Sequence, residues 1–295
     1  MSENAVRLPA KRKKVSRFQE ITHRLSKNVG AMIGAVIVLL VILIALTCDL
    51  WIDYEADVIA INGSQMLQHP SSQHIMGTDR YGRDVFLRLV WGARYSLSVG
   101  IISTMIAAAI GTTVGLLAGY FGGWIENLLL RATDIFASVP TILMGIVIVS
   151  ALGASTFSLM LAVGICMATP FVRMIRSVTL TIRNQEYVQA ARALGMPGWR
   201  IVFLHILPNC VSQLIVQISL RVGHAIITAA SLSFLGLGVP LPAPEWGAML
   251  SEARNYIRGY SYLCLYPGLA IMIVVLAFNM FGDGLRDAMD PKLKK

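Results

Sequence analysis

Residues 30–50 read GAMIGAVIVLLVILIALTCDL, and this stretch decides the class of fold. Asp49 is its one charged residue, next to the end of the run. A helix needs about 20 mostly apolar residues to cross the hydrocarbon core of a bilayer. We therefore expect residues 30–50 to form a membrane-spanning helix.

Five further apolar runs follow, at about 97–119, 135–153, 156–172, 211–233 and 263–282. Of the 295 residues, 56% are hydrophobic and 14% are charged, whereas soluble domains carry roughly 25% charged residues. A soluble fold of this composition would expose large apolar patches. The sequence therefore predicts an all-α integral membrane protein with about six transmembrane helices.

The distribution of Lys and Arg predicts the orientation in the membrane. Basic residues accumulate in residues 1–29, between Arg173 and Arg200, and after residue 285. Cytoplasmic segments carry the excess of Lys and Arg, so both ends of the chain are predicted in the cytoplasm. An interfacial helix with snorkelling side chains would accommodate the arginines of the first outer loop: Arg80, Arg83, Arg88 and Arg94. The net charge of +9 fits this distribution, and no nucleic-acid partner is expected.

The basic tail before the first run raises the question of a signal peptide. The run is long for the apolar part of such a peptide, and no small-x-small cleavage site follows it, so we expect an uncleaved anchor. The expected layout is a basic cytoplasmic tail (1–29), a first transmembrane helix (30–50), an extracytoplasmic loop (51–95), a five-helix transmembrane domain (96–285) with a cytoplasmic loop at 184–209, and a cytoplasmic tail (286–295).

Sequence signatures of catalysis are missing. The chain has no GxxxxGK[ST] phosphate loop, no HExxH and no GxSxG nucleophile elbow. Its four cysteines show no CxxC spacing, and its five histidines are scattered. We therefore expect neither an enzyme nor a bound cofactor or metal. If transport is active, its energy must come from another subunit or from an ion gradient.

The loop 184–209 has the pattern of a short helix, a sharp turn and a second helix. Glu186 begins a run of helix formers, Gly195 stands where a left-handed C-cap is common, and Pro197 cannot continue the helix. The second amphipathic stretch leads to Pro208 at the membrane entry. Such a helix could pack into a groove of another protein; the alternative is an ordinary interfacial loop.

This loop resembles the EAA loop of bacterial ATP-binding-cassette importers, in which EAA is followed by a glycine and then by I-x-L-P. The matching residues are Gln189, Ala190, Ala191, Gly195 and His205-Ile-Leu-Pro208. Gln189 stands in place of the glutamate and His205 in place of the first isoleucine. The charge of a glutamate that could pair with an ATPase is therefore missing.

Three further motifs narrow the family. They are Gly77-Thr-Asp-Arg-Tyr-Gly-Arg-Asp84, Ala230-Ser-Leu-Ser-Phe-Leu-Gly-Leu-Gly238 with Pro244-Glu-Trp-Gly247, and Phe281-Gly-Asp-Gly-Leu-Arg-Asp-Ala-Met-Asp-Pro291. They resemble signatures of the C-type permease subunit of dipeptide, oligopeptide and nickel importers. The resemblance implies a five-helix core plus an N-terminal helix, the type I importer fold, in the inner membrane of a bacterium.

The resemblance also implies an assembly. A second, homologous permease would complete the pore, two ATPase subunits would use ATP, and an extracytoplasmic binding protein would deliver substrate. The coupling residues would be Glu186, Gln189, Ala190, Ala191, Gly195 and Pro208. Peptides are the first expectation for the substrate, with nickel or metallophore complexes as the alternative.

Arg221 is the one charge well inside a predicted span, where an arginine costs roughly 2.5–3.5 kcal/mol. It could contact substrate together with His224 at i+3, pair with an acid of the partner permease, or snorkel. Asp79, Arg83 and Asp84 are expected to form a charge network that shapes the outer loop. Trp246 is expected to anchor at the interface or to lie in a docking face. An ion-coupled secondary transporter is less favoured, because no acid lies in the middle of a span.

Overall fold

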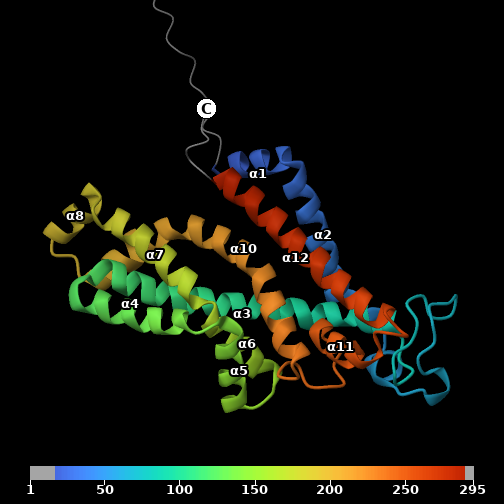
Figure 1. Ribbon diagram of the computed structural model, residues 1–295. Coiled ribbons are helices and arrows are strands. Elements are labelled where there is room, and N and C mark those ends of the chain that lie inside the picture. Colours follow the sequence, from blue (N-terminus) through green and yellow to red (C-terminus); the bar gives the residue numbers. More distant parts are fainter. Residues whose placement is uncertain (1–16, 290–295) are drawn as a thin grey trace, which may run out of the picture.

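The computed structural model describes residues 17–289, which are helical apart from turns, loops and an isolated antiparallel bridge between Thr78 and Asp84. The α-helices are α1 (Arg17–Lys27), α2 (Val29–Thr47), α3 (Val85–Phe121), α4 (Gly123–Ser138), α5 (Thr141–Leu152), α6 (Thr156–Cys166), α7 (Ala168–Arg183), α8 (Glu186–Ala193), α9 (Gly198–Ile201), α10 (Leu207–Phe234), α11 (Trp246–Ala253) and α12 (Tyr262–Met289) (Figure 1). Short 3-10 or π turns are η1 (Cys48–Leu50), η2 (Tyr54–Ile59), η3 (Gly63–Gln65), η4 (Val202–Ile206) and η5 (Arg254–Tyr256). Of the predicted tails, 1–29 and 286–295, residues 1–16 and 290–295 lie outside the described residues.

The described residues contain four continuous helical stretches that are long and apolar enough to cross a membrane. They are Val29–Leu50, Val85–Phe121, Gly198–Phe234 and Tyr262–Met289. Two bent pairs bring the number to six if each pair is one span: α4 with α5, bent by 96°, and α6 with α7, bent by 42°. The prediction of an all-α membrane protein with about six spans is therefore confirmed.

The predicted runs 135–153 and 156–172 are not straight helices. The first is broken at Val139–Pro140 and the second at Met167. Proline disfavours helical geometry in the residue before it, so α4 ends ahead of Pro140. Pro170 in the first turn of α7 has no N–H to donate, so α7 can begin there but cannot continue the ladder from α6.

α3 is the central helix and packs against α2, α6, α7 and α10. Its closest neighbour is α7, which faces glycines spaced four residues apart. A Cβ atom added at Gly111, Gly115 or Gly119 would lie 2.2, 2.8 or 2.7 Å from the Cβ of Phe171, Ile175 or Thr179, respectively. Small residues at such spacing let the backbones of two membrane helices approach closely, which supplies packing where lipid offers no hydrophobic driving force.

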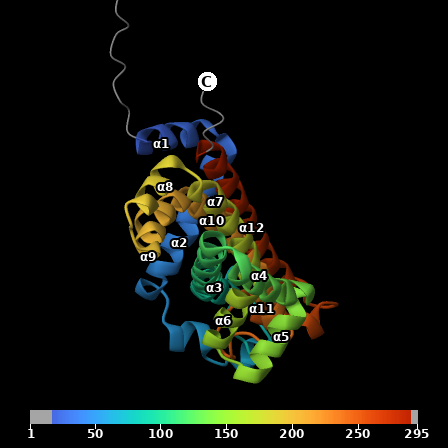
Figure 2. The same ribbon diagram turned by 90° about the vertical axis from the view of Figure 1, so that its left-hand side faces the viewer.

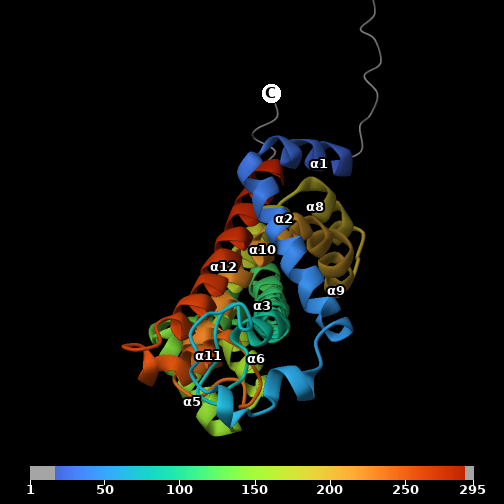
Figure 3. The same ribbon diagram turned by 90° about the vertical axis from the view of Figure 1, so that its right-hand side faces the viewer.

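The two ends of the molecule carry different elements. Figures 2 and 3 show α1 and α8 toward one end and α11 toward the other, and the last turns of α12 lie beside α1. We call the first the inner end and the second the outer end, because the positive-inside rule assigns the basic segments beside α1 and α8 to the cytoplasm.

Replacement of Gly115 by Leu should destabilise the protein, because the new side chain would overlap Ile175 and the carbonyl of Val172. Overpacking of this kind costs about 1–3 kcal/mol. The expected result is a lower yield of monodisperse protein and a lower Tm in detergent. Ala109→Leu, on an exposed face of the same helix, is the matched control and should leave both unchanged. Equal yield and Tm for the two variants would contradict the packing described.

Candidate functional site

The loop at the inner end has a defined turn after α8. Gly195 has φ +76°, the N–H of Gly195 donates to the carbonyl of Arg192 at 3.0 Å, and the N–H of Met196 donates to the carbonyl of Ala191 at 3.1 Å. These two bonds form the Schellman motif, whose left-handed residue is usually glycine. The turn sends the chain back through Pro197 into α9.

α8 has one buried face and one exposed face. Val188 is fully buried and Ala191 nearly so, in a cluster with Ile201 of α9 and Ile206 of η4. The exposed side chains on and after α8 include Glu186, Tyr187, Gln189, Ala190, Arg192 and Leu194, of which Leu194 is 87% exposed. Apolar side chains therefore remain uncovered on this face of the loop, as expected for a surface that packs against another protein.

Pro208 lies inside the continuous stretch Gly198–Phe234, as the second residue of α10 after η4. Pro208 has no N–H to donate to the helix, and the π turn η4 changes the backbone hydrogen-bonding pattern just before it. The side chain of Asn209 donates to the carbonyl of His205 at 2.7 Å. The Asn209 side chain thus adds a hydrogen bond at the junction between η4 and α10.

A cavity lies between the two broken spans and α10. It has a volume of about 430 Å³ and is lined by both breaks, at Val139 and at Met167, and by Arg221, His224 and Thr228. Irregular backbone at membrane depth is tolerated where it lines a water-filled cavity. Arg221 and His224, predicted from sequence to lie on one face, thus both open into this cavity.

The cavity face of α10 continues as a polar stripe. Gln213, Gln217, Arg221, His224 and Thr228 follow one another at intervals of three or four residues, and each is at least partly exposed. The sequence analysis selected only Arg221 and His224, although the spacing of three or four residues between all five is visible in the sequence. Across residues 17–289, Arg221 makes no ion pair, so its charge faces the cavity or another subunit.

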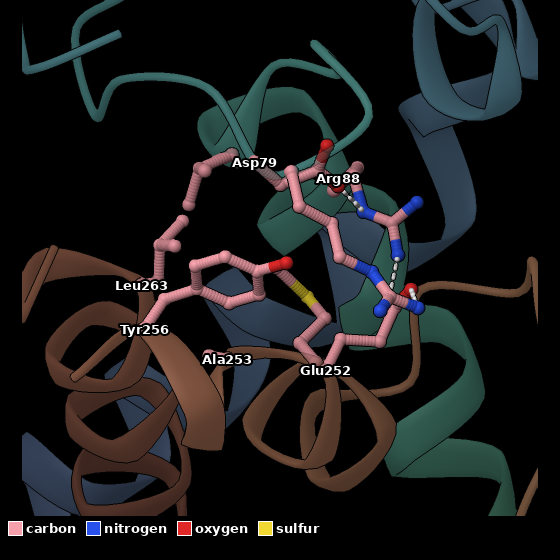
Figure 4. Close-up of a pocket in the computed structure, with 9 residues that line it drawn as sticks. Asp79, Arg88, Glu252, Ala253, Tyr256 and Leu263 are labelled. Atoms are coloured by element: carbon pink, nitrogen blue, oxygen red, sulfur yellow. Dashed lines mark hydrogen bonds and ion pairs between the residues drawn. The ribbon is translucent and has the colours of Figure 1, made fainter. Parts of the chain in front are cut away.

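The outer end is held by a buried charge network, of which Figure 4 shows Asp79, Arg88 and Glu252. Arg83 and Arg88 are 4% and 1% exposed. Their Nη2 atoms donate to the carboxylate of Glu252 on α11 at 3.0 and 2.9 Å, and Nε of Arg83 donates to Asp79 at 2.7 Å. Two acids thus balance two buried arginines. The sequence suggested the pairing of Asp79 with Arg83 but not Glu252, which lies 169 residues from Arg83.

Asp84 has a different partner. It caps α3 by accepting from the backbone N–H groups of Phe86 and Leu87, and its other oxygen bonds to Nδ1 of His74 at 2.8 Å. The expected interfacial helix with snorkelling arginines is wrong, because α3 runs unbroken from Val85 and Arg88 is buried by Glu252.

The expectation of an interfacial anchor at Trp246 is also wrong. Trp246 is 2% exposed, and its Nε1 donates to the carbonyl of Leu89 at 2.9 Å. Glu245 caps α11 through the N–H groups of Gly247 and Ala248. The absence of a side chain at Gly92 lets the Pro244–Trp246 segment pack against α3, since a Cβ at Gly92 would lie 2.1 Å from the carbonyl oxygen of Pro244. The segment Pro244–Gly247 therefore packs α11 against α3, and Trp246 does not face lipid.

Comparison with known proteins gives consistent results over most of the chain. Residues 111–295 match the family described as binding-protein-dependent transport system inner membrane component, and residues 16–70 match the N-terminal transmembrane domain of oligopeptide transport permease C. The dipeptide transport system permease protein of Alkalihalophilus pseudofirmus is 46% identical, over 95% of this chain and 91% of its own length.

Two further relatives and one solved structure agree. Glutathione transport system permease proteins of Pectobacterium atrosepticum and Escherichia coli are 48% and 44% identical over 76% of this chain, covering 75% and 74% of their own lengths. A structure of a methionine ABC transporter in inward-facing conformations matches with a TM-score of 0.56 at 20% identity, over 68% of this chain and 96% of that one, which shows a common fold. The resemblance seen in the sequence motifs is confirmed, and the chain belongs to the family of inner membrane components of binding-protein-dependent transport systems.

Proposed function

We propose that this chain forms half of the translocation pore of an ATP-driven importer of peptides. The observation that carries the proposal is the 46% identity over almost the whole chain to a protein named a dipeptide permease. Relatives named as glutathione permeases support the same substrate class, because glutathione is itself a peptide. Peptides are proposed in preference to nickel, since none of the relatives named above is a nickel permease.

The proposed assembly contains a second homologous permease, two ATPase subunits at the inner end and a substrate-binding protein at the outer end. Pores of this kind alternate between discrete states that their ligands bias. Closure of the ATPase dimer on ATP would draw the inner loops of the two permeases together, open the outer end and admit substrate from the docked binding protein. Hydrolysis would reset the pore.

α7 offers a direct mechanical path for this coupling. It begins at the Met167 break, beside the cavity, and ends at Arg183, three residues before α8. A helix of this length spans about 24 Å and moves as a rigid rod. We infer that α8, with Glu186, Gln189, Ala190 and Ala191, sits in the ATPase, and that the turn at Gly195 and the π turn before Pro208 fix its angle.

The proposed role of Arg221 and His224 is to line the pathway. A guanidinium at a wet cavity wall attracts anionic groups, and the free carboxylate of a peptide is such a group. The other polar side chains of the α10 stripe can form hydrogen bonds with the substrate that are exchanged for others as it moves along the pore. The outer network of Asp79, Arg83, Arg88 and Glu252 has a structural role in this scheme and keeps α11 on α3, while Asp84 caps α3.

The first test is reconstitution. The complete transporter in liposomes should take up a labelled dipeptide only when ATP is inside and the binding protein is outside, whereas this chain alone should not hydrolyse ATP. Peptide uptake is measured together with released phosphate. ATP hydrolysis that scales with the concentration of the isolated chain, or uptake without the ATPases, would refute the scheme.

The second test concerns coupling. Gly195→Leu should abolish most uptake while membrane insertion persists, because a left-handed conformation costs an L-residue about 1–2 kcal/mol. No heavy atom lies within 4 Å of the position of the added Cβ, so the effect must come from the backbone and not from a clash inside this chain. Gly195→Asn is the matched control, because asparagine tolerates this conformation, and it should retain uptake. Normal uptake by the leucine variant, at normal complex yield, would remove the loop from the coupling scheme.

The third test separates two roles of Arg221. If it lines the pore, Arg221→Gln should preserve complex yield and raise the half-saturating substrate concentration or slow uptake. If it pairs with an acid of the partner permease, the same change leaves a buried carboxylate unpaired, at a cost of roughly 3–5 kcal/mol, and lowers the yield. Neutralisation of that acid should then restore the yield. Unchanged yield together with unchanged uptake would exclude both roles.

A further inference from the structure

The outer end contains a second cavity that the pathway does not use. It has a volume of about 280 Å³ and lies between the end of α10, the loop that follows it, and α11. Polar or charged residues that line it include Arg80, Ser233, Ser251, Glu252, Arg254 and Asn255. Its rim carries exposed Leu241, which is 52% exposed.

Two buried polar atoms at this cavity lack a hydrogen-bond partner. They are Nε of Arg80 and Oγ of Ser233, and Ser233 is only 3% exposed. A buried donor without a partner costs about 1–3 kcal/mol, so native structures seldom leave one unmatched unless something else fills the site. Both atoms are covered by neighbouring atoms, so an acceptor that enters the cavity would reach Arg80 through the exposed part of its guanidinium.

The charge balance indicates that the acceptor is an anion. Asp79 and Glu252 are engaged by Arg83 and Arg88, the two buried arginines. Arg80 reaches Glu252 only at 3.8 Å, and its guanidinium instead stacks over the ring of Tyr81. Arg254 is exposed and makes no ion pair in the described part of the chain. Arg80 and Arg254 therefore leave a positive excess at the cavity, and a carboxylate can accept side-on from guanidinium N–H groups.

The position of the cavity separates it from the cargo. Successive residues of a helix are turned by about 100°, so Ser233 faces about 120° away from Arg221 and about 180° away from His224. The cavity thus lies behind α10 as seen from the pathway. It opens at the outer end, where a partner that delivers substrate must dock, and exposed Leu241 would be covered by such a partner.

We propose that this cavity receives a carboxylate side chain of the extracytoplasmic substrate-binding protein, held between Arg80 and Arg254. The carboxylate would accept from the guanidinium N–H groups of both arginines while the apolar rim packs against the surrounding surface of the partner. Docking would then bear directly on Glu252, which holds α11 and α3 together. The inference rests on the proposed import function, because it requires a docking partner.

The test uses the complete transporter in lipid nanodiscs and its substrate-loaded binding protein. The readout is the concentration of binding protein that gives half-maximal stimulation of ATP hydrolysis. Arg254→Glu should raise this concentration at least about tenfold, because it places a like charge against the incoming carboxylate. Arg258→Glu makes the same charge change on an exposed arginine that does not line the cavity, and it should shift the value less than about threefold.

One additional transporter variant and a series of binding-protein variants sharpen the result. Ala154→Glu, at the exposed rim, should also raise the half-saturating concentration, because its own carboxylate can occupy the arginines. Surface acids of the binding protein are then changed to Lys one at a time, and one of these variants should restore docking to the Arg254→Glu transporter.

Several results would overturn the proposal. Equal shifts for Arg254→Glu and Arg258→Glu would indicate only a general electrostatic effect. A change in the half-saturating substrate concentration, with docking unchanged, would assign the carboxylate to the cargo. The proposed function itself fails in a different way, since the wild-type transporter would then show no stimulation by the binding protein and no peptide uptake.

Discussion

The hydrogen-bonding demand of the backbone in a bilayer is the constraint on which this structure depends. Within hydrocarbon, N–H and C=O groups must be paired inside the segment or reach water in a cavity. Four continuous spans meet the first condition. The two bent pairs break at Val139–Pro140 and Met167, and both breaks line the cavity that also contains Arg221. The irregular backbone and the charge of Arg221 thus lie at one place, where water can solvate both.

Close packing around α3 gives this cavity a rigid frame. Glycines on α3 allow α7 to lie against it, and α7 extends from the Met167 break to the loop before α8. A displacement at α8 therefore has a short and stiff path to the cavity wall. At the outer end, Glu252 holds two buried arginines and fastens α11 to the start of α3. Removing Glu252 alone would leave Asp79 as the one acid beside two buried arginines, so this end should move as one body.

Much of the plan could be predicted from residues close together in the chain. Apolar runs identified the spans because about 20 such residues are needed to cross a bilayer. Gly195 and Pro197 identified the turn after α8 because backbone conformation there depends on the residue itself, and the left-handed φ of Gly195 agrees with that prediction. The proximity of Asp79 and Arg83 followed from their spacing in one loop.

Contacts between distant segments could not be obtained in this way. In the sequence Glu252 has the character of an ordinary loop acid, and its pairing with Arg88 requires α11 to pack on α3. Trp246 likewise has the character of an interfacial anchor, and its burial requires the space beside Gly92. The breaks beside Pro140 and Pro170 line a cavity only because the fold places both of them against α10. The sequence by itself determined the membrane class, the spans and the local turns, because these depend on hydropathy and on single-residue conformation. The tertiary structure alone decided which charges are buried, which are paired and which face a cavity, because burial and pairing depend on segments that the chain brings together only when it folds.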